Sequence, residues 1–302
     1  MQSRRRFCST VAGGGIAGLA GCLGGESVSV LSAGSLAVVL EDHVGRAFEN
    51  ETSVEFHGEY YGTNAAIRMV EDGHKHPDVL ISADNVLLRD RLYENHTDWD
   101  VEFASNSVGL AYNPDTDFGR RLDADEPWYE VAAEAEAGEL AISDPDLDPL
   151  GYRAMLAFQL AEAEYDLDGF VDRLADRVYR EPEEPQLLAG VGTGNRAAAV
   201  SYRNMAVDHG LPFFEFPDSY NFANPEYEAQ YASVSYTTDE GYTARGNPIV
   251  YNATVLDRAD TPVAGLEFVR FLADSHDLLA ENGLTVDGFP NSHGAVPDEI
   301  QL

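Results

Sequence analysis

Three aspartates at alternating positions form the densest chemical motif of the sequence. Asp144, Asp146 and Asp148 lie in the stretch SDPDLDPLGYR. Carboxylates at this spacing can bind a metal ion, transfer protons or shape turns. A calcium loop of the EF-hand type needs glycine at its sixth position and glutamate at its twelfth, where this chain has Pro149 and Met155. We therefore predict that Asp144 and Asp146 form turns, which leaves the role of Asp148 open.

Hydroxyl side chains stand at two turns where a strand-like segment meets a helical one. Ser35 lies between the alternating segment 27–31 and a segment, 36–48, with apolar residues at helical spacing. Thr63 and Asn64 lie at a second turn of the same kind. Such side chains cap helices or donate hydrogen bonds to an anion, and the two roles are compatible. All three residues are therefore candidates for binding an anion.

The sequence contains no recognisable catalytic centre. No His, Cys or Asp cluster has zinc-site spacing, and the nucleophile elbow G-x-S-x-G is absent. His74 and His76 flank Lys75, and we expect this segment to be an exposed loop. The sequence therefore predicts that the protein is not an enzyme.

The charge of the 302-residue chain is strongly acidic. Nineteen Lys and Arg residues stand against 53 Asp and Glu residues, which gives a formal net charge of −34. The acids are spread along the chain, and in molar salt a Debye length of about 3 Å mutes their repulsion. This pattern favours adaptation to high salt over mimicry of DNA. A nucleic-acid binder is excluded because the sequence has no basic stripe.

The N-terminal residues have the features of an export signal. Ser3–Phe7 resembles a twin-arginine motif, and Leu19–Cys22 resembles the lipobox of lipoproteins. The apolar run between them is too short for a transmembrane helix of about 20 residues. We predict that residues 1–21 are removed and that Cys22 is lipidated and starts a tether, 22–27. The protein would then be anchored by lipid to the extracellular face of the cell membrane.

Strand-like and helical segments alternate along the rest of the chain. Strands are expected at 27–31, 53–58, 77–85, 107–113, 139–145, 197–202 and 247–256, and helices at 36–48, 65–71, 152–165, 167–178 and 263–284. This alternation predicts two α/β lobes, each with a central, mostly parallel sheet flanked by helices. Lobe 1 would comprise residues 28–112 and 232–302, and lobe 2 residues 113–231. Ligands of such sheets bind at the carboxyl ends of the strands.

Four segments make the chain similar to a known family. They are AGSL (33–36), YGTNAAIR (61–68) followed by HPDVLISAD (76–84), SDPDLDPLGYR (143–153) and NPIVYNATVL (247–256). They resemble the archaeal molybdate/tungstate-binding proteins, which are extracytoplasmic components of ABC importers. The resemblance implies the type II periplasmic-binding-protein fold, which closes on a ligand in the interlobe cleft. It also implies an ABC permease and ATPase as partners, a monomeric state and no cofactor.

The resemblance also assigns roles to single residues. Ser35 and Thr63, the latter where the family usually has serine, would donate to the oxyanion. Tyr202 matches the binding tyrosine of the family. Asp148 matches a carboxylate that is a direct ligand to Mo(VI) or W(VI), hard centres that accept further oxygen ligands. Because sulfur and phosphorus cannot accept this ligand, Asp148 would discriminate against sulfate and phosphate.

The chain departs from the family pattern in one place. A glutamate is expected just before Tyr202, but Ser201 stands there, and Glu215 lies beyond the tyrosine. The acidic segment 181–186, EPEEPQ, is expected to be a loop. Ser201 is therefore kept as a candidate, and the bound metal would be four- or five-coordinate. The alternatives are a binding protein for sulfate or phosphate and, from another class, an extracellular enzyme or adhesin.

Overall fold

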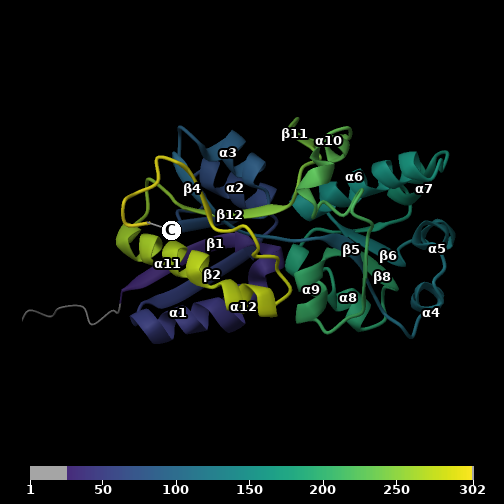
Figure 1. Ribbon diagram of the computed structural model, residues 1–302, viewed down its shortest axis with the longest axis horizontal. Coiled ribbons are helices and arrows are strands. Elements are labelled where there is room, and N and C mark those ends of the chain that lie inside the picture. The colour runs from purple at the N-terminus through teal and green to yellow at the C-terminus, as the bar shows by residue number, and fades with distance from the viewer. Residues whose placement is uncertain (1–25, 301–302) are drawn as a thin grey trace, which may run out of the picture.

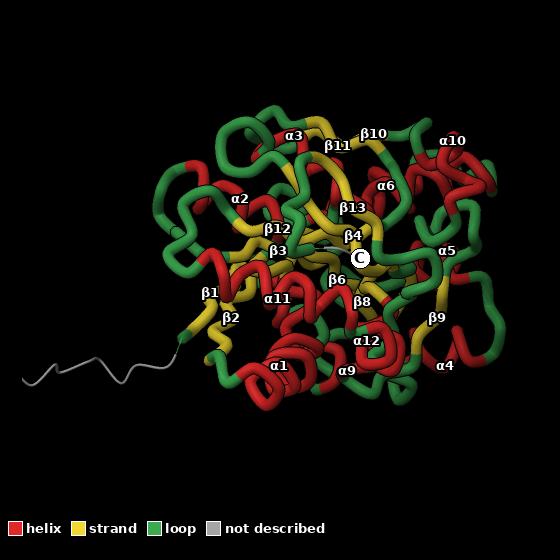
Figure 2. The backbone as a smooth tube through the Cα atoms, turned by 60° about the vertical axis from the view of Figure 1, so that its left-hand side comes forward, coloured by secondary structure: helices red, strands yellow, loops and turns green. Residues whose placement is uncertain are grey.

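Two sheets, each covered by helices, form the centres of two lobes that lie side by side (Figure 1). The computed structural model describes residues 26–300. The strands run through the interior of the lobes, and the helices lie around them (Figure 2). The two-lobed α/β fold class that the sequence predicts is confirmed.

The first lobe is built on a six-stranded sheet with the order β13-β4-β12-β3-β1-β2. Its strands are β1 (Ser27–Ala33), β2 (Glu55–Tyr61), β3 (Val79–Ser82), β4 (Trp99–Ser105), β12 (Val250–Val255) and β13 (Asn291–Gly294). β1 pairs in parallel with β2 and β3, whereas β12 is antiparallel to β3 and β4. The sheet is therefore mixed rather than mostly parallel, because β12 and β13 join it only after the chain returns from the second lobe.

Helices cover both faces of this sheet. They are α1 (Gly45–Thr52), α2 (Thr63–Glu71), α3 (Asn85–Leu92), α11 (Pro262–Asp274) and α12 (His276–Glu281). α2 and α3 lie on one side, and α1 and α11 on the other (Figure 2). Alternation along β1 supplies apolar residues to both faces. Val28 and Val30 belong to the same core cluster as Phe268 of α11, whereas Leu31 packs with Ile67 of α2.

The second lobe is built on a five-stranded sheet with the order β7-β6-β8-β5-β9. Its strands are β5 (Val108–Tyr112), β6 (Leu140–Ser143), β7 (Tyr179–Glu181), β8 (Ala198–Tyr202) and β9 (Phe213–Glu215). Its helices are α4 (Asp117–Asp123), α5 (Trp128–Glu134), α6 (Pro149–Glu164), α7 (Phe170–Ala175), α8 (Ala189–Gly192), α9 (Arg203–Asp208) and α10 (Glu228–Tyr231). β6 is parallel to β7 and β8, and β5 is antiparallel to β8 and β9, so this sheet is also mixed.

The first crossing between the lobes lies earlier than the sequence predicts. β4 ends at Ser105 in the six-stranded sheet, and β5 begins at Val108 in the five-stranded sheet. Residues 108–112 therefore belong to the second lobe, and the predicted boundary at 112/113 is wrong. The error arises because a strand pattern shows that a segment pairs, but not with which sheet.

The second crossing follows a small hairpin, β10 (Ser235–Thr237) and β11 (Thr243–Arg245). The hairpin contacts both lobes, because Gln159 of α6 donates to the carbonyl of Ser235 and Arg68 of α2 forms an ion pair with Glu240. The return to the first lobe near residue 232 therefore remains a proposal.

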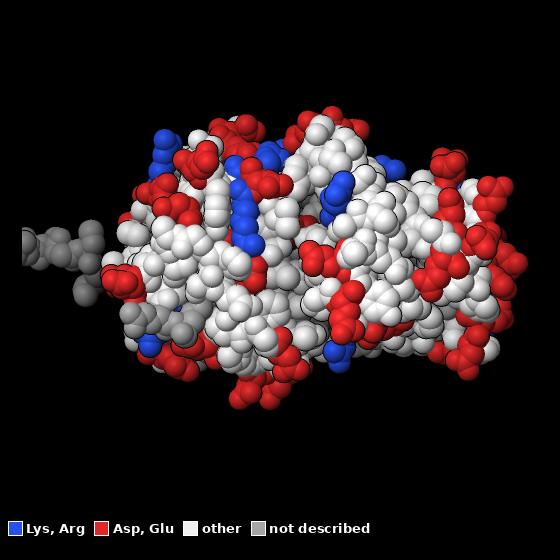
Figure 3. Space-filling view, turned by 45° about the horizontal axis from the view of Figure 1, so that its top comes forward, with Lys and Arg blue, Asp and Glu red and all other residues white. Residues whose placement is uncertain are grey.

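The surface reflects the acidic composition. On the face drawn in Figure 3, Asp and Glu side chains are scattered over both lobes, and Lys and Arg occur at isolated places. This face carries no broad basic patch of the kind that binds a phosphate backbone.

Candidate functional site

The turn after β1 brings Ser35 to the junction of the lobes. Ser35 lies in a 3₁₀ turn, Gly34–Leu36, and is only 2% exposed. Its carbonyl accepts a hydrogen bond of 2.7 Å from Nδ2 of Asn204, which belongs to α9 of the second lobe. Ser35 therefore lies at the carboxyl end of a strand and faces the opposite lobe, where a ligand between the lobes would be bound.

The turn after β2 also meets the second lobe. Thr63 and Asn64 start α2 and are buried. The amide of Ala65 donates to the carbonyl of Leu147 in the second lobe at 3.1 Å. The hydroxyl oxygen of Thr63 accepts from the amide of Ala83 at 3.1 Å, and the side-chain oxygen of Asn64 has no partner among the described residues. Both residues lie at the lobe junction, and their contact with a ligand stays a prediction.

Asp148 occupies the N-cap position of α6 without capping the helix through its side chain. It is 1% exposed, and neither carboxylate oxygen has a hydrogen-bond partner in the described part of the chain. Asp144, by contrast, accepts a 3.0 Å hydrogen bond from the amide of Asp146, as expected of a turn residue. Of the three aspartates, Asp148 alone presents an unsatisfied buried carboxylate.

A second unsatisfied carboxylate comes from the segment that was expected to be only a loop. Glu184 begins a 3₁₀ turn and is completely buried, and neither of its oxygens has a partner within residues 26–300. A Cβ atom built on Gly34 would lie 2.9 Å from Oε2 of Glu184, so this oxygen reaches the turn that carries Ser35. The structure therefore places a second buried carboxylate, which the sequence analysis did not single out, at the turn that carries Ser35.

Asp148 and Glu184, hereafter the carboxylate pair, affect each other's ionisation. Burial raises the pKa of Asp148 to about 6, although the nearby Ser143 hydroxyl and Leu150 amide act to lower it. Burial and the charge of Asp148 raise the pKa of Glu184 well above its usual range, although the Ser35 amide acts to lower it. These donors lie close to the carboxylates without making hydrogen bonds of ordinary geometry. The pair is therefore desolvated, mutually repulsive and unsatisfied.

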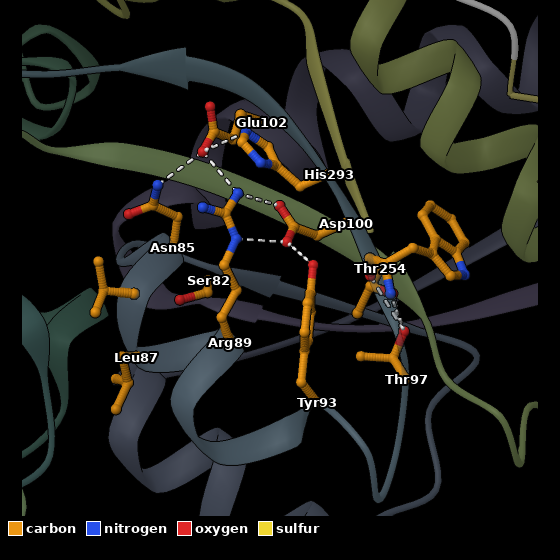
Figure 4. Close-up of polar contacts among 12 residues, drawn as sticks. Ser82, Asn85, Leu87, Arg89, Tyr93, Thr97, Asp100, Glu102, Thr254 and His293 are labelled. Carbon is orange, nitrogen blue, oxygen red and sulfur yellow. Dashed lines mark hydrogen bonds and ion pairs between the residues drawn. The ribbon is translucent and has the colours of Figure 1, made fainter. Parts of the chain in front are cut away.

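Another pair of buried carboxylates in the first lobe is satisfied internally (Figure 4). Asp100 accepts two hydrogen bonds from Arg89, at 2.8 and 2.9 Å, and one from the hydroxyl of Tyr93 at 2.5 Å. Glu102 accepts from Arg89 and from Asn85, each at 2.7 Å. The protein thus neutralises buried carboxylates that serve its structure. Among residues 26–300, the carboxylate pair at the lobe junction has no such partners, which makes it a candidate ligand site.

Arg153 connects the lobes beside the carboxylate pair. This fully buried side chain of α6 donates to the Ala83 carbonyl at 2.8 Å and to Oδ2 of Asp84 at 3.0 Å, both in the first lobe. The hydroxyl of Tyr152 donates to the same Asp84 oxygen at 2.6 Å. Arg153 also donates to the hydroxyl oxygen of Tyr202 at 2.6 Å. Tyr152 and Arg153 of the motif therefore hold the two lobes together.

Tyr202 lies where the sequence predicts, at the end of β8 next to the lobe junction. It is completely buried, and burial raises the pKa of its hydroxyl well above the usual range. The charges of Asp148 and Glu184 act in the same direction, while Arg153 opposes them. The hydroxyl therefore stays protonated at neutral pH and can donate a hydrogen bond to a ligand.

The candidate Ser201 and the acid Glu215 lie on the last two strands of the second lobe. Ser201 is buried in β8, but alternation along the strand places its side chain on the face opposite that of Tyr202. Glu215 is exposed on β9, at the edge of the sheet. The hydroxyl of Ser201 is buried without a partner among the described residues, and its role at the site stays a prediction.

The remaining motifs lie elsewhere. His74 and His76 are exposed, as expected, and among the described residues no cluster of His, Cys, Asp and Glu could hold a resident metal ion. The predicted export signal and the lipidation site at Cys22 lie outside the described residues.

Sequence reasoning missed three residues of the junction. Glu184 could not be separated from the other acids of 181–186, because their order shows no periodicity. Arg153 belonged to a quoted motif but had no assigned contact. Tyr251 of β12 is completely buried, and its hydroxyl donates to Oγ of Ser35 at 3.3 Å. A tyrosine among the apolar residues of a central strand was the available signal for Tyr251.

A two-lobed fold with a buried, partnerless polar site between the lobes defines a class of ligand-binding proteins that close around their solute. Known proteins agree with this assignment. The chain belongs to the family of bacterial extracellular solute-binding proteins, whose sequence model matches residues 28–284.

Individual relatives extend over nearly the whole chain. A solute-binding protein of Halobacterium salinarum is 49% identical, over 99% of this chain and 97% of the relative. A Haloferax volcanii protein, provisionally named an ABC transporter molybdenum-binding protein, is 38% identical over 98% and 96% of the two chains. The molybdate/tungstate-binding protein WtpA of Thermococcus kodakarensis is 27% identical over 93% and 91%.

A solved structure shares the fold. The periplasmic molybdate-binding protein of Azotobacter vinelandii superposes with a TM-score of 0.62 at 14% identity, over 86% of this chain and 98% of that one. This likeness shows the fold, and the family model makes the chain an extracellular solute-binding protein rather than an enzyme. Within residues 26–300, no helix has both the length and the apolar character needed to cross a membrane.

Proposed function

We propose that the protein binds molybdate or tungstate between its lobes and delivers it to the permease of an ABC importer. The observation that carries the proposal is the carboxylate pair, which is fully buried at the lobe junction without hydrogen-bond partners. Relatives with molybdenum, molybdate or tungstate in their names support the choice of ligand.

The chemistry of the site suits an oxyanion with a Lewis-acidic centre. Neutral donors hold a tetrahedral dianion well, and here they are the hydroxyls of Ser35, Thr63 and Tyr202 near the start of α6. Two carboxylates would repel a sulfate or phosphate ion. They are favourable only if the central atom accepts their oxygens, as Mo(VI) and W(VI) do. With four oxo groups and one oxygen from each carboxylate, the metal would be six-coordinate.

A receptor for sulfate or phosphate is the second candidate. The hydroxyl donors alone would suit either anion, and protonated carboxyl groups could donate to it as well. The negative charge of Asp148, which has a pKa of about 6 and is mostly ionised near pH 7, argues against this candidate.

The direct test is thermal unfolding in molar KCl with millimolar tungstate, molybdate, sulfate or phosphate added separately. A ligand at about 1,000 times its dissociation constant adds roughly 4 kcal/mol to the free energy of unfolding. We expect tungstate and molybdate to raise the melting temperature and the other two anions to leave it unchanged. A shift with sulfate or phosphate alone would establish the second candidate instead.

Gly62→Ala is expected to hinder closure of the lobes without unfolding either of them. The backbone angles of Gly62, φ −56° and ψ 138°, are ordinary for alanine. In this structure, however, the new Cβ would lie 2.4 Å from the carbonyl oxygen of Leu147, across the junction. Tungstate affinity should fall by about tenfold or more, because such a contact forces the lobes apart. Isothermal titration calorimetry would measure the loss.

Gly192→Ala is the matched control for this prediction. A Cβ at Gly192 would meet nothing within 4 Å. Its tungstate affinity should equal that of the wild type. An unchanged affinity of Gly62→Ala would mean that the ligand is bound without the interlobe contact seen here.

We further propose that twin-arginine export and a lipid on Cys22 hold the protein, as a monomer, at the extracellular face of the membrane. The N-terminal motifs support export and lipid anchoring, and the acidic composition supports adaptation to high salt. Mass spectrometry of the membrane-bound protein would detect the lipid, and an unmodified N-terminus would contradict the proposal.

A further inference from the structure

Each of the three hydroxyls proposed to hold the ligand already accepts a hydrogen bond from the protein. The donors are the hydroxyl of Tyr251, the amide of Ala83 and the guanidinium of Arg153. We propose that these donors orient the hydroxyl protons toward the ligand, and that Tyr251 and Arg153 are therefore positioning residues for oxyanion binding. The inference rests on the proposed function, because it assumes an oxyanion at the lobe junction.

The direction of the hydrogen bonds at Ser35 follows from one backbone amide. The amide of Ser107 can only donate, and it donates to Oδ1 of Asn106 at 2.9 Å. This contact identifies the other end of the Asn106 amide as the NH₂ group. That group donates to the hydroxyl oxygen of Tyr251 at 3.2 Å. The Tyr251 proton is then available for Oγ of Ser35, at a rather long 3.3 Å.

The order of donors leaves the proton of Ser35 without a hydrogen bond of ordinary geometry among residues 26–300, with the carboxylate of Glu184 close beside it. A second hydrogen bond from the same NH₂ group, to Oδ1 of Asn204 at 2.8 Å, holds the network in place. Asn204 in turn donates to the carbonyl of Ser35. The chain of hydrogen bonds therefore runs from Asn106, at the crossing between the lobes, to the ligand-facing serine.

Tyr202 and Thr63 are arranged in the same way. Arg153 has only donors, so the Tyr202 hydroxyl at 2.6 Å from it must act as acceptor in that contact. The amide of Ala83 likewise can only donate to Thr63. In both cases the hydroxyl oxygen accepts a hydrogen bond from the protein, which leaves the hydroxyl proton to be donated to the ligand.

The consequence is a site whose hydroxyl groups act as donors. A fully deprotonated oxyanion presents only acceptors and is matched to such a site. A hydroxyl whose oxygen accepts a hydrogen bond is also a stronger donor, because consecutive hydrogen bonds polarise one another. Tyr251 and Arg153 thus contribute to affinity without touching the ligand.

A double-mutant cycle between Tyr251→Phe and Ser35→Ala tests the inference. The phenylalanine ring preserves the packing of Tyr251 on Phe103 and Tyr202, whose ring centroids lie 6.1 and 6.0 Å away. We expect Tyr251→Phe alone to weaken tungstate binding by roughly threefold to tenfold, the effect of one hydrogen bond. In the Ser35→Ala background it should change the dissociation constant by less than about twofold, because Tyr251 acts through Ser35.

A second cycle, between Arg153→Lys and Tyr202→Phe, probes the other positioning residue. Lysine keeps the charge but loses the planar fork of donors. The effects of the two substitutions on affinity should again be less than additive. This cycle also tests the inference if Tyr251→Phe folds poorly.

Tyr220→Phe is the matched control. Tyr220 is completely buried in the second lobe, where its hydroxyl accepts from the indole of Trp128 at 2.8 Å. Its loss should lower the melting temperature and leave tungstate affinity unchanged.

The outcomes separate the inference from the proposed function. Additive effects in both cycles, with tungstate bound by the wild type, would overturn the inference alone. If the wild type binds sulfate and not tungstate, the proposed ligand is wrong, and non-additive cycles measured with sulfate would still support the inference. A wild type that binds neither anion would overturn both.

Discussion

Glu184→Gln is expected to abolish discrimination between tungstate and sulfate while stabilising the ligand-free protein. The amide is a poor ligand for W(VI), so tungstate affinity should fall by about 10- to 100-fold or more, the range found for changes around protein metal sites. Sulfate, which gains nothing from a carboxylate, should bind equally well or better. Isothermal titration calorimetry with both anions would measure the ratio of affinities.

The stabilisation of the ligand-free protein follows from the pKa shifts. The pKa of Asp148 is raised from 3.8 to about 6, and that of Glu184 is raised well above its usual range. A raised carboxyl pKa means that the folded protein binds protons more tightly than the unfolded chain. The stability associated with these protons is therefore fully present at low pH and is lost as the pH rises from about 4 through 6 and above.

The loss of stability is limited by the pH interval over which the two carboxyl groups titrate. One unit of pKa shift corresponds to about 1.4 kcal/mol, so each carboxyl costs at most a few kcal/mol at pH 8. Glu184→Gln removes one of these titrations and relieves the repulsion of Asp148. Denaturant unfolding from pH 4 to 8 should show a weaker decline of the free energy of unfolding than in the wild type.

Glu183→Gln is the control, because Glu183 is the exposed neighbour of Glu184 in the same loop. Both its anion affinities and its pH profile should resemble those of the wild type. If Glu184→Gln kept its preference for tungstate, Glu184 would not be a ligand and the proposed coordination would have to be abandoned.

Arg153→Met is expected to weaken both the fold and the binding of tungstate. Methionine fills part of the volume but leaves Asp84 as a buried carboxylate without its cation, a change that costs about 3–5 kcal/mol. It also removes the donor behind Tyr202 and the positive charge that opposes the high pKa of Asp148. Tungstate affinity should fall by roughly 100-fold or more, because interlobe and ligand contacts are lost together.

Small-angle X-ray scattering would test the interlobe part of this prediction. Wild-type protein should contract when tungstate is added, whereas Arg153→Met should remain extended at the same concentration. Arg89→Met is the control, because Arg89 pairs with Asp100 and Glu102 inside the first lobe (Figure 4). It should destabilise that lobe and still contract with tungstate. Full contraction of Arg153→Met would show that Arg153 does not hold the lobes together.

The sequence by itself determined the features that depend on neighbouring residues. Alternating and helical periodicities located the strands and helices, because each pattern depends only on residues that are close in the sequence. The turns that carry Ser35 and Thr63 were recognisable because small polar residues stand between a strand and a helix. The DPLGYR motif singled out Asp148, and the four family segments together pointed to a two-lobed binding protein.

Only the tertiary structure decided which distant residues meet. Glu184 resembles its acidic neighbours in sequence, and its burial against the Gly34 turn results from the packing of one lobe on the other. The assignment of 108–112 to the second lobe depends on pairing with β8 and β9, which a strand pattern does not encode. The contacts of Arg153 also cross between the lobes. These features depend on long-range contacts, whereas a sequence pattern records only local ones.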